Sequence, residues 1–171
     1  SAAATDVPMP QRWSDWIKGR FGPATDVSNL PNLGEGLALF LADPDAMRFL
    51  AVKYVVFPAG TVVGEPLGSE ITLVHRDGVS DVYRLAGAKP YFDAGAGGCR
   101  VDTRSRTEVV VECDSRTRLV RRELYFPDWT ATVDGRSATI TPAHGLYRAA
   151  VAPAGRHVVR FSYGPARWPL A

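Results

Sequence analysis

The stretch C-R-V-D-T-R-S-R-T-E-V-V-V-E-C, from Cys99 to Cys113, has a polar centre between two flanks in which apolar and polar residues alternate. Alternation with a period of two indicates β-strands, and a polar centre between such strands indicates a turn. The midpoint is Arg106, so an antiparallel hairpin folded there brings the two cysteines opposite each other. Such a pair can form a disulfide, which is typical of an oxidising compartment. Two buried, reduced thiols would fit the same spacing.

Segments with strand character continue on both sides of this hairpin. They are short, rich in β-branched and aromatic residues, and separated by turn signals such as Asp77-Gly78 and Asp134-Gly135. Many short strands at this spacing predict a mainly β fold, either a β-sandwich or a jelly roll. The predicted strands cover residues 52–57, 70–75, 79–85, 99–102, 107–113, 118–126, 130–133, 138–141, 147–151 and 157–163.

The N-terminal part of the chain has helix signals in place of this strand pattern. Trp13 and Trp16 are spaced for one face of a short helix that ends near Gly19. The two rings could touch a membrane surface, but so few apolar positions make a very small membrane face, which favours packing. Further along, Asp43 followed by Pro44 is typical of a helix start, with an N-cap and a proline at the first helical position.

Length and composition set the domain organisation. With 171 residues, 46% of them hydrophobic, the chain can bury the core of one globular domain. We expect a helical or irregular segment over residues 1–51 that packs on a β-sandwich over residues 52–165, followed by a tail over 166–171. The formal net charge is +2 and arginines are spread along the chain, so a nucleic acid is not an expected partner. No apolar run approaches the roughly 20 residues needed to cross a bilayer.

The sequence contains no recognisable catalytic or metal-binding constellation. The histidines, His75, His144 and His157, have no zinc-ligand spacing, and motifs for a nucleophile elbow, a dinucleotide or a phosphate loop are absent. We therefore expect this chain to be no enzyme, with no catalytic residue, metal or cofactor. A hidden pair of glycosidase carboxylates is the enzymatic alternative, because sequence spacing does not reveal how far apart two acids lie across a sandwich.

Four motifs occur in a specific order. L-A-V-K-Y-V covers residues 50–55, and V-Y-R-L covers 82–85. The pattern E-x-Y-x-P-x-W-x-A-x-V-D-G covers 123–135, and V-x-P-A-G-x-H-x-V-x-F-x-Y-x-P covers 151–165. In this order they resemble the C-terminal soluble portion of YfhO-like bacterial membrane proteins, which cross the membrane many times and are related to glycosyltransferases of the GT-C superfamily. The chain departs from the family pattern at Ala51, Asp128 and His144.

The resemblance implies a location and a role. It implies a soluble domain on the extracytoplasmic face of the bacterial cytoplasmic membrane, joined to a membrane-embedded core of the same polypeptide. In such enzymes the catalytic acids lie in the membrane core. Domains of this kind are often similar to carbohydrate-binding modules, in which aromatic rings stack on the apolar faces of sugars and polar side chains bind the hydroxyl groups.

Candidate ligand-binding residues follow from strand periodicity and from loop position. Counting by two places Arg121, Glu123 and Tyr125 on one face, which is polar enough for a sugar site. A cross-strand ion pair beside a packed ring would explain the same pattern. Trp129 and Tyr163 are expected in the core by the same counting. The candidates are Tyr91, Arg121, Glu123, Tyr125, His144 and Tyr147.

Two of these candidates lie on predicted loops. Tyr91 with Phe92 could form an exposed aromatic platform, although a hydrophobic plug under the loop fits equally well. His144, beside the flexible Gly145 and near Tyr147, could contact a ligand, although a lone loop histidine is usually solvated.

The favoured hypothesis is a non-catalytic accessory domain that binds or positions a glycan or glycolipid acceptor. The alternative is a structural or protein-interaction module that docks on the membrane core or on an envelope partner without binding sugar. A separate glycan hydrolase is the third hypothesis. An exposed aromatic side chain flanked by polar groups would favour the first, and a contiguous apolar patch would favour the second.

Overall fold

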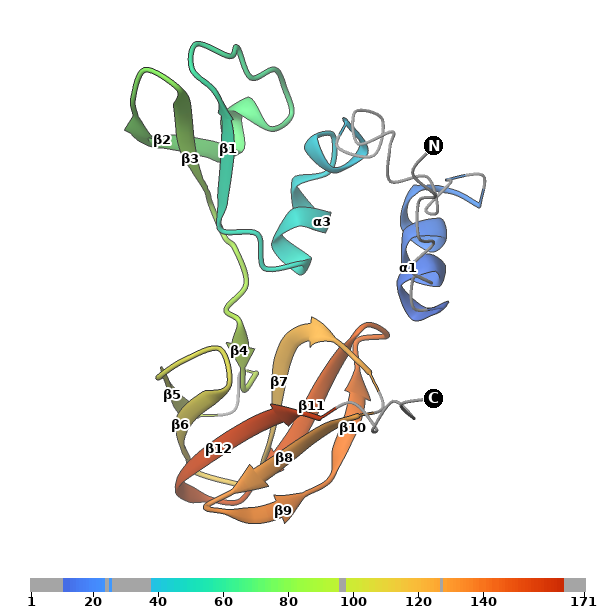
Figure 1. Cartoon of the computed structure of the whole chain (residues 1–171), viewed down its shortest axis with the longest axis vertical. Helices are drawn as coiled ribbons and strands as arrows, with labels where there is room; N and C mark the ends of the chain where they lie inside the picture. Colours follow the sequence, from blue (N-terminus) through green and yellow to red (C-terminus); the bar gives the residue numbers. More distant parts are fainter. Residues whose placement is uncertain (1–10, 24, 26–37, 96–97, 127, 165–171) are drawn as a thin grey trace, which may run out of the picture. The chain divides into compact units, whose positions relative to one another are not determined.

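The computed structural model describes residues 11–23, 25, 38–95, 98–126 and 128–164. The described residues are mainly β, with 47% strand and 17% helix, and their strands form three antiparallel sheets (Figure 1). It divides into two compact units, Ser1–Lys89 and Pro90–Ala171. The sequence led us to expect a division after Ala51. The difference arises because the strands between residues 54 and 85 pair with one another in a sheet of their own. The predicted tail, 166–171, lies outside the described residues.

The first unit contains a three-stranded sheet. Its order is β1 (Tyr54–Pro58), β3 (Ser80–Leu85) and β2 (Ile71–Arg76). The short 3-10 helix η2 (Gly68–Glu70) comes directly before β2 in the chain. The buried side chains of this unit include Met47, Leu67 and Leu85, which pack with half-buried apolar residues of β1 and of the helical part. Helix and sheet therefore share one small core within this unit.

Helix α3 (Pro44–Phe49) of the first unit begins where the sequence indicates. It is capped by Asp43, whose carboxylate accepts a hydrogen bond of 3.0 Å from the Ala46 backbone amide. Helix α1 (Gln11–Phe21) extends two residues past Gly19, the predicted end. The Trp16 ring stacks on Phe49 with centroids 5.4 Å apart, so this tryptophan packs within the unit. The apolar residues Leu37, Leu39, Phe40 and Leu41 indicate a further helix in the sequence. Residues 38–41 are helical, and Leu37 lies outside the described residues.

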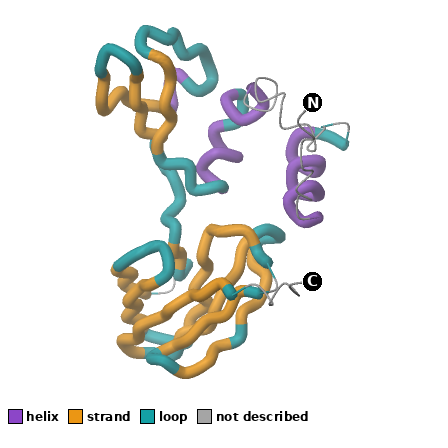
Figure 2. The backbone as a smooth tube through the Cα atoms, in the orientation of Figure 1, coloured by secondary structure: helices purple, strands orange, loops and turns teal. Residues whose placement is uncertain are grey.

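The second unit is built from two sheets that face each other (Figures 1 and 2). The four-stranded sheet has the order β10-β11-β7-β4, and the five-stranded sheet has the order β5-β6-β12-β8-β9. The bounds of the strands are β4 (Phe92–Asp93), β5 (Cys99–Thr103), β6 (Glu108–Cys113), β7 (Thr117–Leu124), β8 (Trp129–Val133), β9 (Arg136–Ala138), β10 (Ile140–Ala143), β11 (Tyr147–Ala152) and β12 (Gly155–Tyr163).

One apolar core fills the space between these two sheets. Leu119 on β7 and Ala150 on β11 come from the four-stranded sheet, and Val111 on β6 and Phe161 on β12 come from the five-stranded sheet. All four are buried and belong to one cluster. A shared core between two antiparallel sheets is the arrangement of a β-sandwich, so the predicted fold class is confirmed at that level.

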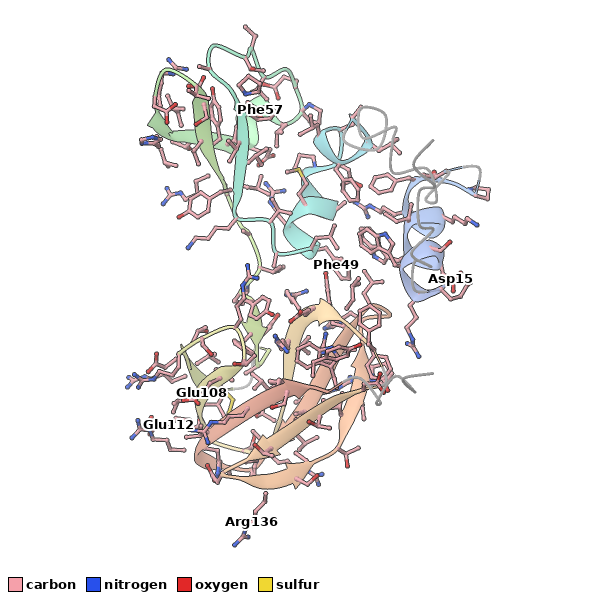
Figure 3. The ribbon with its side chains drawn as sticks, viewed as in Figure 1. Asp15, Phe49, Phe57, Glu108, Glu112 and Arg136 are labelled. Carbon is pink, nitrogen blue, oxygen red and sulfur yellow. A yellow bond between two sulfur atoms is a disulfide. The ribbon has the colours of Figure 1, made fainter. Side chains whose placement is uncertain are left out.

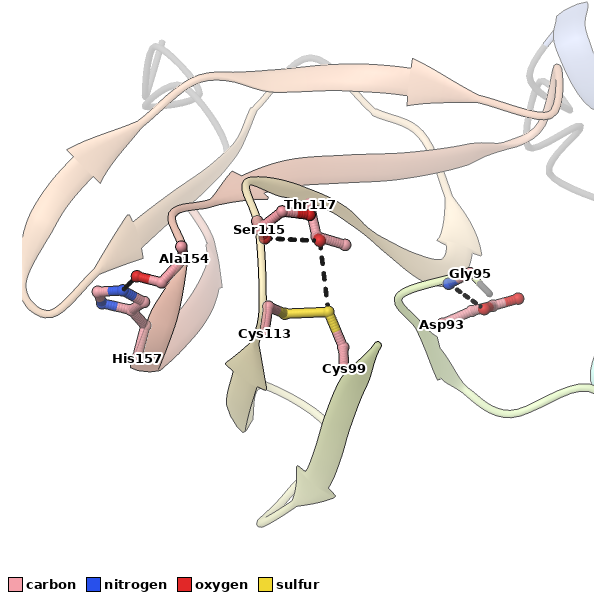
Figure 4. The surroundings of a disulfide bond; sticks show 8 residues. All are labelled: Asp93, Gly95, Cys99, Cys113, Ser115, Thr117, Ala154 and His157. Carbon is pink, nitrogen blue, oxygen red and sulfur yellow. Dashed lines mark hydrogen bonds between the residues drawn. A yellow bond between two sulfur atoms is a disulfide. The ribbon is translucent and has the colours of Figure 1, made fainter. Parts of the chain in front are cut away.

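The hairpin over residues 99–113 has the predicted register. Cys99 pairs with Cys113 across β5 and β6, and their sulfurs form a disulfide (Figure 4). The Thr117 hydroxyl oxygen lies 3.3 Å from the Cys99 sulfur. The same hydroxyl donates a hydrogen bond of 2.9 Å to the Ser115 carbonyl oxygen. The disulfide therefore lies beside the start of β7.

Candidate functional site

Strand β7 carries charged side chains into the interior of the sandwich. Leu119 is in the core, and two residues further along Arg121 follows on the same face. The Arg121 guanidinium carbon lies 4.3 Å from the centroid of the Trp129 ring and 5.4 Å from that of Phe161, and both rings belong to the opposite sheet. Only 2% of Arg121 is exposed. The arginine therefore lies between the two sheets.

Three predicted residues form one hydrogen-bonded network. Tyr91 donates its hydroxyl proton to Glu123 Oε2 at 2.5 Å, and Arg121 Nη2 lies 2.5 Å from the same oxygen. Arg121 Nε also donates to the Tyr91 hydroxyl oxygen at 3.1 Å. Burial and the neighbouring Glu123 raise the pKa of Tyr91, so its phenol keeps the proton that it donates. We name this group, together with Trp129 and Arg148, the arginine site.

A second arginine lies beside the first. Arg148 on β11 is directly opposite Arg121 on β7, after a register shift between Tyr147 and Arg148. Its guanidinium carbon lies 3.6 Å from the centroid of the Trp129 ring, which supplies a cation–π contact. Arg148 Nη2 donates to the Leu124 carbonyl oxygen. The side chain is fully buried.

The two arginines have more donors than the described residues satisfy. Arg121 Nη1, Arg148 Nε and Arg148 Nη1 are buried and have no hydrogen-bond partner among the described residues. Burial and the positive charge of Arg121 lower the pKa of Arg148 to about 10, so the Arg148 guanidinium is still charged at pH 7. The described ionised partner in the arginine site is Glu123, which leaves one positive charge uncompensated there.

Other charged residues lie on the opposite face of the same sheet. Arg122 Nη2 is 2.7 Å from Asp93 Oδ2, and its guanidinium carbon is 5.4 Å from the centroid of the Tyr147 ring. The pKa of Asp93 is lowered because hydrogen bonds from the Gly95 amide and from Arg122, and the charges of Arg122 and His144, outweigh its partial burial. Tyr147 is a buried ring of this face, and burial raises its pKa to about 12.

The structure thus separates the six predicted ligand-binding residues. It joins Tyr91, Arg121 and Glu123 in the arginine site. Tyr147 belongs to the other face of the sheet. His144 is exposed at a turn, with a backbone φ of 50°. Tyr125, just beyond the end of β7, is half-buried and donates its backbone amide to the Leu146 carbonyl oxygen at 2.8 Å.

Sequence reasoning missed two members of the arginine site. Trp129 is half-buried and packs on the core, yet its ring also supports both arginines. Arg148 was not singled out, although an arginine inside the apolar run Y-R-A-A-V-A is a signal that could have found it. Counting by two was wrong for Tyr163, which is 49% exposed because it stands at the end of β12.

A separate groove of about 820 Å³ lies in the same unit. Its lining includes Arg116, Arg136, Asp134 and His157, and Arg136 points away from β9 in Figure 3. His157 Nδ1 is 2.6 Å from Asp134 Oδ2, and Nε2 is 3.0 Å from the Ala154 carbonyl oxygen (Figure 4). The described lining contains no phenylalanine, tyrosine or tryptophan, so the groove offers a sugar no such ring for stacking.

The described part of the chain has neither a metal-ligand cluster nor a helix that could span a membrane. No group of three or more histidine, cysteine, aspartate or glutamate side chains is arranged to hold a metal ion there. None of the helices described is long and apolar enough to span a membrane.

Comparison with known proteins adds no family to these observations. No protein-family model, no curated protein and no solved structure matches the chain.

Proposed function

We propose that the chain is a non-catalytic accessory domain that binds or positions a glycan acceptor. In this proposal it belongs to a YfhO-like membrane protein related to GT-C glycosyltransferases, and it works on the extracytoplasmic side of the bacterial membrane. In this proposal the β-sandwich binds a sugar as a carbohydrate-binding module does. The order of the four sequence motifs supports the family, and the arginine site supports the role.

The observation that carries the proposal is the network of Tyr91, Glu123 and Arg121. Tyr91 is half-buried, and the side chain of Glu123 is 40% exposed, so the network reaches the surface. A sugar needs an aromatic ring for its apolar face and fixed polar groups for its hydroxyls. Tyr91 supplies the ring, and the Glu123 carboxylate, held by two hydrogen bonds, supplies a positioned acceptor.

The disulfide supports the proposed location. Disulfides persist in oxidising environments and are rare in proteins of the reducing cytosol. The pairing of Cys99 with Cys113 therefore fits a domain outside the cytoplasmic membrane.

The test is an NMR titration of the ¹⁵N-labelled chain with cell-envelope glycan fragments, recorded as amide shifts. We expect saturable shifts centred on Tyr91, Glu123 and the strand β7. Tyr91→Ala should weaken binding by about tenfold or more, because it removes the ring. Tyr54→Ala is the matched control, since Tyr54 is an exposed tyrosine of the first unit. No shift with any fragment would contradict the proposal.

One observation favours the alternative, a docking module without sugar affinity. On one face of β1, Tyr54 and Val56 are 49% and 62% exposed, and Val56 pairs with the half-buried Val82 on β3. Exposed apolar side chains gathered on one sheet face are typical of protein contacts. If Val56→Ser abolishes association with the membrane core and Tyr91→Ala does not affect any function, the docking hypothesis replaces the glycan hypothesis.

A further inference from the structure

The arginine site carries an unbalanced charge in a buried place. Arg121 and Arg148 contribute two positive charges, and Glu123 contributes one negative charge. The Arg122–Asp93 pair on the opposite face is balanced within itself. A charge that is removed from water without a counterion is costly, so buried charges are normally paired. One negative charge is therefore missing from the inner face.

The unpartnered donors indicate where that charge belongs. Arg121 Nη1 and two nitrogens of Arg148 are buried without a partner among the described residues. The cation–π contact with Trp129 is an attraction between each guanidinium charge and the ring, and the indole supplies no lone-pair acceptor for the N–H donors. The tryptophan thus leaves the donors unsatisfied. Buried N–H donors are normally hydrogen-bonded, so we expect an acceptor at this place.

We propose that Arg121 and Arg148 bind a singly charged oxyanion on the glycan ligand, either a carboxylate or a phosphodiester. This inference rests on the proposed glycan-binding function and names the chemical class of its ligand. A planar guanidinium fork matches carboxylate and phosphate oxygens. A single negative charge balances the site, whereas a doubly charged phosphomonoester exceeds what the site lacks.

Glu123 shows how an acidic group is held at this position and where it enters. Its carboxylate takes hydrogen bonds from Arg121 and Tyr91 while 40% of its side chain remains exposed. The site therefore runs from Glu123 and Tyr91 at the surface to the fully buried Arg148. An acid on the ligand enters beside Glu123 while its sugar ring stays against Tyr91.

The test compares four ligands on the full chain by NMR titration. Glucose is the neutral sugar, and glucuronate carries a carboxylate. The methyl ester of glucose 1-phosphate carries a phosphodiester, and acetate is an acid without a sugar. We expect the two acidic sugars to bind about tenfold or more tightly than glucose, since hydrogen bonds to charged groups are worth that factor. The stronger of the two identifies which oxyanion the site prefers.

Two variants locate the effect. Arg148→Met removes the two unpartnered donors of Arg148 and keeps an apolar side chain of similar length. It should reduce the acid-to-neutral affinity ratio to about one, whereas the control Arg116→Met, in the other groove, should leave the ratio unchanged. If Arg148→Met does not fold, the side-chain Nε–Hε resonance of Arg148 in the unaltered chain gives the answer, because bound glucuronate must shift it.

The outcomes separate the two proposals. If glucose binds as tightly as the acidic sugars, the oxyanion inference is wrong and glycan binding stands. If acetate binds at Arg148 as tightly as glucuronate, oxyanion binding by the two arginines stands, but the sugar contributes nothing, which contradicts the proposed function and the glycan part of the inference. If no ligand binds, both are wrong. An acid effect that is lost in Arg116→Met moves the site to the groove and overturns the inference.

Discussion

Arg148 lies directly opposite Arg121 in the ladder between β7 and β11, with both side chains buried against the ring of Trp129. Like charges in directly opposed positions destabilise a sheet. Burial and the repulsion between the two positive charges both disfavour the charged form of Arg148, which lowers its pKa to about 10. The arrangement therefore costs stability, and ligand binding is the function that we propose for it.

Replacing Arg148 tests that cost directly. We expect Arg148→Met to raise the free energy of unfolding by about 1 kcal/mol, because exchange of a buried, uncompensated charge for an apolar side chain is neutral or stabilising. Arg122→Met is the matched control. It leaves the Asp93 carboxylate without its guanidinium and should lower stability by about 1–3 kcal/mol. Urea unfolding followed by circular dichroism measures both, and a large loss in Arg148→Met would contradict the interpretation.

Removing the negative charge from the arginine site should have the opposite effect. Glu123→Gln leaves Arg121, which is 2% exposed, without its ionised partner, and should lower the free energy of unfolding by about 1–2 kcal/mol. Glu112→Gln, at an exposed position on β6 (Figure 3), should stay within about 0.5 kcal/mol. Equal effects in the two variants would mean that Glu123 does not compensate the buried arginines.

The His157–Asp134 pair predicts a loss of stability at alkaline pH. Both ring nitrogens of His157 face oxygen acceptors, so the imidazolium, which donates from both, is the favoured form. The hydrogen bond to Asp134 raises the pKa of His157 above 6.5. A group whose pKa is raised by folding stabilises the fold fully below its unfolded pKa, and this contribution is lost as pH rises through the folded value.

The measurement is the free energy of unfolding at several pH values from about 6 to about 9, which bracket the ordinary histidine range. The unaltered chain should lose stability over this range, and His157→Gln should show a flatter profile. His75→Gln is the control, because His75 is an exposed histidine of the first unit. A profile that is unchanged in His157→Gln would show that the pair does not contribute.

Reduction of the disulfide should destabilise the second unit. Cys99 and Cys113 are 14 positions apart, and a cross-link that closes a loop of this size contributes about 3 kcal/mol in the chain-entropy model. We expect Cys99→Ser with Cys113→Ser to lower the free energy of unfolding by that order. Mass spectrometry of protein isolated from its native compartment, with and without reductant, tests the location. Free thiols there would contradict an extracytoplasmic domain.

In the first unit, Asp81 should be the most sensitive charged residue. Its carboxylate is fully buried, pairs with Arg76 Nε at 2.6 Å, and accepts a hydrogen bond of 3.1 Å from the Gly60 amide. Asp81→Ala should therefore cost about 2 kcal/mol of unfolding free energy. Asp77→Ala, an exposed aspartate of the same hairpin, should cost less. Similar losses would show that the Arg76–Asp81 pair is not important for the unit.

Several elements follow from the sequence because their causes are local. A period of two with a polar centre was sufficient to predict the hairpin and the pairing of Cys99 with Cys113. Asp43 and Pro44 predicted the start of α3 because capping involves residues only three apart. Nearly every predicted strand is present. The strand expected over 138–141 is divided between β9 and β10, and the two-residue β4 was missed because so short a strand has no periodicity.

The site itself was decided by tertiary structure. Tyr91 meets Glu123 over a separation of 32 positions because β4 pairs with β7, and no local pattern encodes that pairing. The register shift beside Arg148 places it opposite Arg121, and a bulge of this kind redirects side chains in a way that counting by two cannot predict. Local alternation is thus sufficient to predict which segments form strands. The partners of each strand, and with them the buried charge of the arginine site, depend on how the two sheets pack.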